Sequence, residues 1–128
     1  MLYFILFFLF LNANAFDSCL ISNRINIKMN DNLNISTIFR KSPVSTKPPL
    51  LLIHGSDAGG WIYEEYWMDY FLKNNISSYS INMRGSYETG NLNKDKVNFI
   101  DHVNDLKGVA EYFKSNIEKP ILVAHSYG

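Results

Sequence analysis

Ser126 has the neighbours in the chain that a catalytic nucleophile requires. It stands in the pentapeptide Ala-His-Ser-Tyr-Gly, directly after the apolar segment Ile121–Val123. A serine hydroxyl becomes a good nucleophile when it projects from a sharp strand-to-helix turn toward a base, and such a turn strains the serine backbone. Residues two positions before and after the serine must then be small, as Ala124 and Gly128 are. The pattern indicates a nucleophilic serine, although it also occurs by chance in ordinary turns at strand ends.

A second loop has the composition needed to stabilise negative charge on a substrate oxygen. His54, Gly55 and Ser56 directly follow the continuous apolar run Leu50–Ile53. Sites in open α/β sheets lie at the carboxyl ends of the strands, where such a glycine turn can direct a backbone N–H into the crevice. Two donors of this kind stabilise the oxyanion of acyl transfer, each by about 3 kcal/mol. We predict that the N–H groups of Ser56 and Tyr127 are these donors, and that His54 is a structural histidine bonded within its own loop.

The elements that must position these two loops alternate between strands and helices. An alternating pattern on both sides of a turn at 30–32 predicts a two-stranded hairpin with one solvent-exposed face, and the later segments predict strands buried on both faces and helices. The predicted elements are strands at 25–29, 33–39, 50–53, 76–83 and 121–124, and helices within 61–72 and 98–114. This order, with right-handed crossovers, predicts a three-layer α/β domain with a mostly parallel sheet.

Taken together, these segments resemble the α/β-hydrolase family from about Asn30 to Gly128. The resemblance rests on four ordered motifs, which are Leu-Leu-Leu-Ile-His-Gly, Gly60-Trp61 at the start of the first helix, Asn82-Met83-Arg84-Gly85, and the Ala-His-Ser-Tyr-Gly elbow. It implies that Ser126 forms an acyl-enzyme with a small ester or similar acyl substrate, without metal or organic cofactor. The loop His-Gly-Ser-x-x-Gly-Gly-Trp looks most like those of small esterases, methyl esterases and hydroxynitrile lyases. The segment after Arg84-Gly85 departs from the family's frequent Arg-Gly-x-Gly-x-Ser.

The largest departure from the family concerns its catalytic acid and base, which have no counterparts after Ser126 in these 128 residues. In that family an Asp or Glu and then a His follow the serine in the chain, whereas only Tyr127 and Gly128 follow Ser126 here. The side chain of His125 should diverge from that of the serine, and His102 is expected to be a solvated residue of a surface helix. We therefore expect residues 16–128 to form the N-terminal half of a serine hydrolase, ending after the elbow strand and inactive by itself. The alternative is a non-catalytic secreted module or a pseudogene remnant.

Composition excludes several other classes of protein. The 128 residues include 12 Lys and Arg against 12 Asp and Glu, so the chain lacks the basic surface that binding to nucleic acid requires. A single cysteine excludes a disulfide framework and a metal site built from several thiolates, and a hydrophobic content of 47% excludes a disordered chain. No protein partner is predicted.

The first residues of the chain predict export. The apolar run Met1–Leu11 is followed by Asn-Ala-Asn-Ala, which predicts a signal peptide over residues 1–15 and a secreted or extracytoplasmic protein. An uncleaved N-terminal membrane anchor is the alternative, and the membrane is otherwise not expected to be a partner. Two glycosylation sequences, beginning at Asn34 and Asn75, fit export, but in a chain this rich in asparagine their use stays open. Cys19 is assigned no role.

Overall fold

The computed structural model describes residues 23–86, 88–89 and 96–128. The predicted signal peptide and Cys19 therefore lie outside the described residues. No helix in the described part of the chain is long and apolar enough to span a bilayer. The elements are β1 (Asn23–Lys28), β2 (Asn34–Arg40), β3 (Leu50–Ile53), α2 (Trp61–Tyr66), α3 (Met68–Lys73), β4 (Ser78–Ile81), α4 (Phe99–Asn116) and β5 (Ile121–Ala124).

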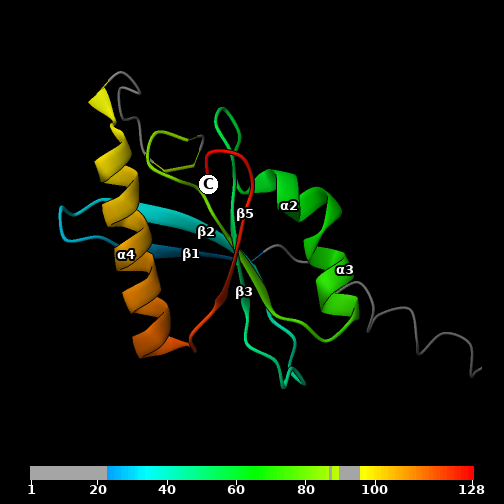
Figure 1. Ribbon diagram of the computed structural model, residues 1–128. Helices are drawn as coiled ribbons and strands as arrows, with labels where there is room; N and C mark the ends of the chain where they lie inside the picture. Colours follow the sequence, from blue (N-terminus) through cyan, green and yellow to red (C-terminus); the bar gives the residue numbers. More distant parts are fainter. Residues whose placement is uncertain (1–22, 87, 90–95) are drawn as a thin grey trace, which may run out of the picture.

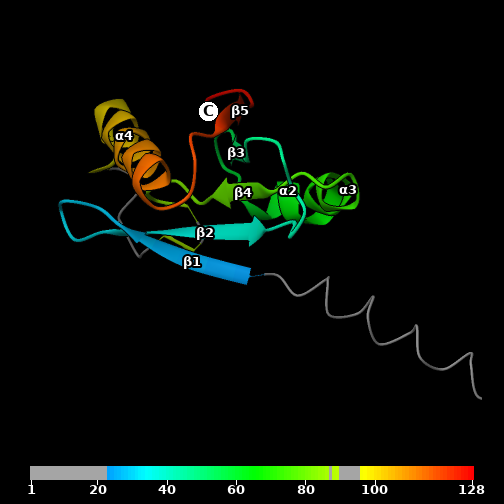
Figure 2. The same ribbon diagram turned by 90° about the horizontal axis from the view of Figure 1, so that it is seen from below.

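The five strands form one sheet in the order β1-β2-β4-β3-β5. The hairpin of β1 and β2 is antiparallel and joins β4 in antiparallel pairing, whereas β4, β3 and β5 run parallel to one another. Helix α4 covers one face of the sheet, and α2 and α3 cover the other (Figures 1 and 2). The predicted three-layer α/β architecture is confirmed.

The core is divided between the two faces of the sheet because successive strand residues point to opposite sides. In β3, Leu51 and Ile53 belong to the cluster under α4, and Leu52 belongs to the cluster under α2 and α3. Phe113 of α4 is fully buried and meets the ring of Tyr79 edge-on, with ring centroids 4.9 Å apart. Strand β3 is therefore buried on both faces, as its apolar run predicts.

The prediction of a hairpin with one exposed face is wrong for β2. Ser36, Thr37 and Ile38 are all buried, because other segments pack on both faces of β2. Ile38 packs under α2 and α3, and the polar side chain of Ser36 is covered by the segment that contains Glu88. Ser36 and Ile38 share this face, and on the opposite face Ile35 belongs to the cluster under α4, so both faces of the strand are buried.

The single helix expected within 61–72 is two short helices that meet at Trp67. Tyr63 of α2 and Met68 of α3 are both buried in the same cluster. Five residues of a continuous helix turn through 500°, which would leave these side chains about 140° apart. The break lets both side chains face the sheet.

Helix α4 begins as predicted and leads into the last strand. Asn98 caps the helix: its side chain accepts a hydrogen bond from the backbone N–H of Asp101, whose carboxylate accepts one from the N–H of Asn98. Strand β5 pairs with β3 on one side, and no strand within the described residues pairs with its other side. Ile121 and Leu122 are 51% and 59% exposed, so the burial on both faces that the apolar sequence of β5 predicts is wrong.

Candidate active site

Ser126 lies on a tight turn directly after β5. Its φ angle is 59°, in the left-handed region that non-glycine residues rarely adopt. The N–H of Gly128 donates to the carbonyl of His125 at 3.1 Å and closes the turn. The N–H of His125 donates to the carbonyl of Ile53 at 3.2 Å, which anchors the base of the turn to the end of β3. The strained backbone that a nucleophilic serine requires is therefore present.

The loop after β3 lies against this turn. A Cβ added to Gly55 would come within 3.0 Å of the Cβ of Ser126, and a Cβ added to Gly128 would come within 2.7 Å of the carbonyl oxygen of Ile53. Both distances are too short for a side chain to fit without movement. Ala124 lies opposite Ile53 in the parallel pairing of β5 with β3. The small residues predicted from the sequence thus lie where the two loops approach each other.

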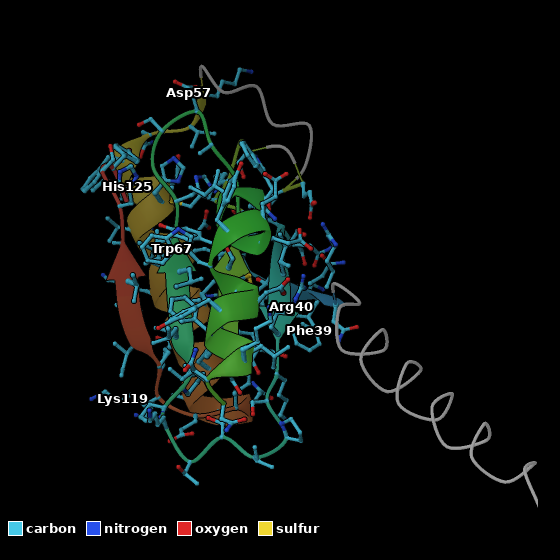
Figure 3. The ribbon with its side chains drawn as sticks, turned by 90° about the vertical axis from the view of Figure 1, so that its right-hand side faces the viewer. Phe39, Arg40, Asp57, Trp67, Lys119 and His125 are labelled. Atoms are coloured by element: carbon cyan, nitrogen blue, oxygen red, sulfur yellow. The ribbon has the colours of Figure 1, made fainter. Side chains whose placement is uncertain are left out.

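The serine turn and the loop after β3 lie at the same end of the sheet. His125 of the serine turn and Asp57 of the other loop lie toward the same end, whereas Lys119, which precedes β5, lies at the opposite end (Figure 3). Asp57 has a φ angle of 56°, so both loops contain a non-glycine residue in the left-handed region. A cavity of about 200 Å³ lies beside them, and Ser56 and Tyr127 are among the residues that line it.

His54 is bonded through both of its ring nitrogens. Its Nε2 accepts the N–H of Met83 at 3.1 Å, so its Nδ1 carries the proton and donates to the carbonyl of Gly55 at 2.7 Å. The side chain is almost fully buried, and this burial lowers the pKa of His54 below its ordinary value. The ring is held neutral, and it connects β3 to the end of β4, which agrees with the structural role predicted for it.

The other two histidines lie near the serine turn but make no hydrogen bond to the serine. The ring of His102 meets the ring of Tyr127 edge-on at 5.6 Å, and its Nδ1 is buried without a hydrogen-bond partner among the described residues. His102 is half-buried, so the expectation that it is a solvated residue is met only in part. His125 is exposed. Within the described part of the chain, the hydroxyl of Ser126 has no hydrogen-bond partner.

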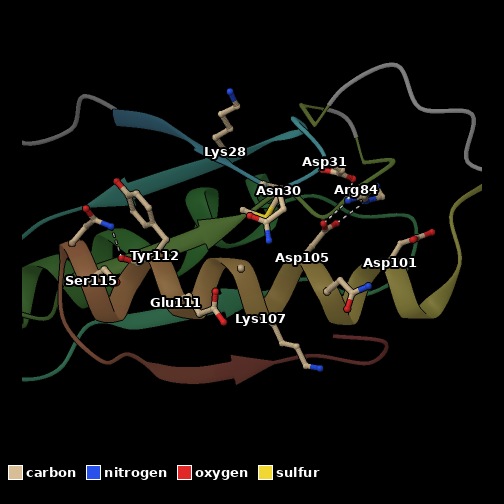
Figure 4. Close-up of a pocket in the computed structure, with 14 residues that line it drawn as sticks. Lys28, Asn30, Asp31, Arg84, Asp101, Asp105, Lys107, Glu111, Tyr112 and Ser115 are labelled. Atoms are coloured by element: carbon tan, nitrogen blue, oxygen red, sulfur yellow. Dashed lines mark hydrogen bonds and ion pairs between the residues drawn. The ribbon is translucent and has the colours of Figure 1, made fainter.

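Arg84 anchors the segment that follows β4. Its guanidinium donates two hydrogen bonds to the carboxylate of Asp105 in α4, at 2.9 and 2.7 Å, and forms a third contact with Asp31 of the hairpin turn at 2.7 Å (Figure 4). The side chain of Asp105 is only 4% exposed. These contacts cross one end of a groove of about 620 Å³ between α4 and the hairpin. The sequence identified Arg84 as part of a motif, but no pattern in the sequence indicated that Asp105 and Asp31 are its partners.

The carboxylate of Glu88 connects the segment that follows β4 to the strands of the hairpin. It accepts hydrogen bonds from Arg24 Nε at 3.0 Å, from the hydroxyl of Ser36 at 2.9 Å, and from the side-chain amide of Asn82 at 3.3 Å. The amide oxygen of Asn82 accepts the N–H of Gly60, which precedes α2, at 2.8 Å. The segment that departs from the family's motif after Arg84-Gly85 thus contains a carboxylate that bonds to β1, to β2 and to the residue that follows β4.

We expect the contribution of Glu88 to stability to depend on pH. Hydrogen bonds from Arg24, followed by the one from Ser36, lower the pKa of Glu88 below its ordinary value of 4.5. A lowered folded-state pKa gives stability that is complete above the unfolded pKa and is lost as pH falls through the folded pKa. Glu88→Gln should therefore cost about 1 kcal/mol near pH 7 and progressively less below pH ~4.5, measured by urea unfolding. Glu65→Gln, at an exposed position of α2, is the control, and a difference that stays constant with pH would contradict this origin.

Comparison with known proteins supports the architecture. No family model matches the chain, and no curated protein does. Among solved structures, an esterase of Pyrococcus furiosus is 20% identical and has a TM-score of 0.66, with 84% of this chain and 43% of the esterase covered. An epoxide hydrolase from an endophytic Streptomyces is 17% identical, with a TM-score of 0.66 and coverage of 84% and 30%. An epoxide hydrolase of Vigna radiata is 15% identical, with a TM-score of 0.65 and coverage of 84% and 32%. The chain spans less than half the length of each.

Proposed function

We propose that this chain, which has the α/β-hydrolase fold, is the nucleophile-bearing part of a secreted serine hydrolase that acts on an ester or similar acyl substrate. The observation that carries the proposal is the left-handed backbone of Ser126 on a turn against which the Gly55 loop packs. A serine held in this conformation at the carboxyl end of a strand presents its hydroxyl to the crevice where open α/β sheets bind their ligands. We propose that the protein is secreted because residues 1–15 have the sequence pattern of a signal peptide.

The chemistry proceeds in two half-reactions. In the first, Oγ of Ser126 attacks the acyl carbonyl while a base takes its proton, and the N–H groups of Ser56 and Tyr127 stabilise the resulting oxyanion. The alcohol then leaves with a proton from that base. In the second, water attacks the acyl-enzyme in the same way and releases the acid. Nothing in this sequence of steps requires a metal or an organic cofactor.

The base and its acidic partner are proposed to come from outside the described residues. His54 uses both ring nitrogens in structural hydrogen bonds, and no described side chain bonds to Oγ of Ser126. In α/β-hydrolases both groups follow the nucleophile in the chain. The 128 residues alone are therefore proposed to be inactive. A non-catalytic module with the same fold is the second candidate, and the unpartnered hydroxyl of Ser126 is the observation that favours it.

A fluorophosphonate probe, which phosphonylates activated serines, tests the proposal on the product of the coding sequence continued past codon 128. We expect an in-frame Asp or Glu, a later His, and labelling that Ser126→Ala abolishes. Ser56→Ala is the matched control, because Ser56 is exposed and acts through a backbone N–H that alanine retains. Labelling that survives Ser126→Ala would refute the assignment of the nucleophile. A stop codon at this position in the transcript would favour the non-catalytic module.

A further inference from the structure

The two Asn-x-Ser sequences of the chain lie in different structural settings. Asn75 occupies the exposed turn between α3 and β4, has a φ angle of 59°, and donates its backbone N–H to the carbonyl of Leu72 at 3.0 Å. Asparagine is one of the few residues that adopt this left-handed conformation readily. Within the described residues, its side-chain amide makes no hydrogen bond. Glycosylated asparagines lie on surface loops of secreted proteins, and Asn75 occupies such a position.

Asn34 is also exposed, but it lies at the start of a strand and not in a turn. It is the first residue of β2 and pairs with Lys28 of β1. Because side chains two apart on a strand share a face, Asn34 lies on the same face as Ser36. On that face Glu88 accepts the hydroxyl of Ser36, and the hydroxyl of Thr89 accepts its N–H at 3.1 Å. A bulky glycan on Asn34 would stand beside this packed segment.

We propose that Asn75 carries an N-linked glycan. The inference rests on the proposed export of the chain and is independent of any reactivity of Ser126. In the transfer, the side-chain nitrogen of Asn75 forms a bond to the first sugar of a lipid diphosphate-linked oligosaccharide. The bond between that sugar and the phosphate breaks, and the lipid diphosphate leaves as the amide gives up one proton.

The position of Asn75 leaves the candidate active site open. Asn75 precedes β4, which runs parallel to β5, so it lies toward the end of the sheet where Lys119 precedes β5 (Figure 3). The serine turn lies at the opposite end of these strands. A glycan on Asn75 would therefore cover surface at the amino ends of the parallel strands and would not obstruct access to Ser126.

The structure also indicates that glycosylation of Asn75 precedes the folding of the segment around it. The hydroxyl of Ser77, the third residue of the acceptor sequence, is buried and accepts the N–H of Ser42 at 3.1 Å. Since this hydroxyl belongs to the acceptor sequence, the glycan must be added before the segment around Ser42 closes over Ser77. Transfer therefore takes place during or soon after entry into the secretory pathway.

Translation of the 128-residue chain with endoplasmic-reticulum microsomes, followed by gel electrophoresis with and without an amidase that removes N-glycans, tests the proposal. We expect an amidase-sensitive shift in mobility that belongs to Asn75. Asn75→Asp should abolish the shift, because aspartate tolerates the same backbone conformation but offers no amide acceptor. Asn34→Asp is the matched control and should leave the shift intact. Ser77→Ala should abolish it, and Ser77→Thr should retain it.

Each contrary outcome overturns the proposal. A chain that gains no glycan in the microsomes, for whatever reason, contradicts glycosylation at Asn75. A shift that is lost in Asn34→Asp and kept in Asn75→Asp would overturn the assignment to Asn75. Because none of these readouts involves the serine, failure here is distinct from failure of fluorophosphonate labelling.

Discussion

Replacement of Asp105 with alanine is expected to lower the free energy of unfolding by about 3 kcal/mol. The Asp105 side chain is buried in α4 and accepts two hydrogen bonds from Arg84, which is itself only 16% exposed. Removing one member of a buried ion pair leaves the other charge without compensation. Arg84 retains its contact with the half-exposed Asp31, which keeps the expected loss at the lower end of the range for such pairs. Urea unfolding, followed by circular dichroism, measures the change.

Glu111→Ala provides the matched control for the Asp105 experiment. Glu111 is an exposed carboxylate in the same helix, and its removal should change stability by less than about 0.5 kcal/mol. Equal losses in the two variants would mean that the effect comes from helix charge and not from the anchor of Arg84. In that case the link between α4 and the segment after β4 would have to be carried by other contacts.

Phe113→Ala is expected to have the largest effect on stability, a loss of about 4 kcal/mol. Phe113 is fully buried between α4 and the sheet, where its ring meets that of Tyr79 edge-on. Truncation removes buried apolar surface, leaves a cavity in the layer that α4 forms over the sheet, and removes an aromatic contact. Thermal and urea unfolding of the variant should agree in showing the loss.

Phe99→Ala tests the same truncation at the other end of the same helix. Phe99 is 60% exposed and contacts only the ring of Tyr127 at 6.0 Å among the aromatic rings of the described residues. Its loss should cost less than about 1 kcal/mol. If Phe99→Ala were as damaging as Phe113→Ala, α4 would not pack on the sheet through the face that contains Phe113.

Local signals in the sequence were enough to locate the two loops of the candidate site. The apolar runs of β3 and β5 end where the structure ends these strands, and Gly55 and Gly128 stand where a side chain would collide with the neighbouring backbone or with Ser126. The start of α4 follows from Asn98 and Asp101, whose capping requires only residues three apart. Such features depend on neighbours in the chain, so they can be predicted from it.

The position of a strand in the sheet could not be predicted in the same way. The alternating residues of β2 suggest an exposed face, yet β2 lies between two strands and under α2, α3 and the segment around Glu88. The uniformly apolar β5 suggests burial on both faces, yet it lies at the edge. Periodicity reports the polarity of the side chains, whereas burial depends on which distant segments pack on each face.

The polar contacts that hold the site together could not be predicted from neighbouring residues in the sequence either. Glu88 bonds to Arg24, 64 residues earlier in the chain, and Arg84 bonds to Asp105, 21 residues later. No periodic pattern connects these partners. The break between α2 and α3 belongs to the same class, because it arises from the need of Tyr63 and Met68 to reach one apolar cluster. Long-range packing decided each of these features.

The catalytic role proposed for Ser126 requires a base from outside the described residues. The most direct measurement is mass spectrometry of the 128-residue chain, shown to be folded by cooperative urea unfolding, after exposure to a fluorophosphonate. We expect no adduct on Ser126, because no described side chain bonds to its hydroxyl and because His54 uses both ring nitrogens in structural hydrogen bonds. An adduct on Ser126 that disappears in Ser126→Ala would contradict this proposal, since the 128-residue chain would then contain its own base.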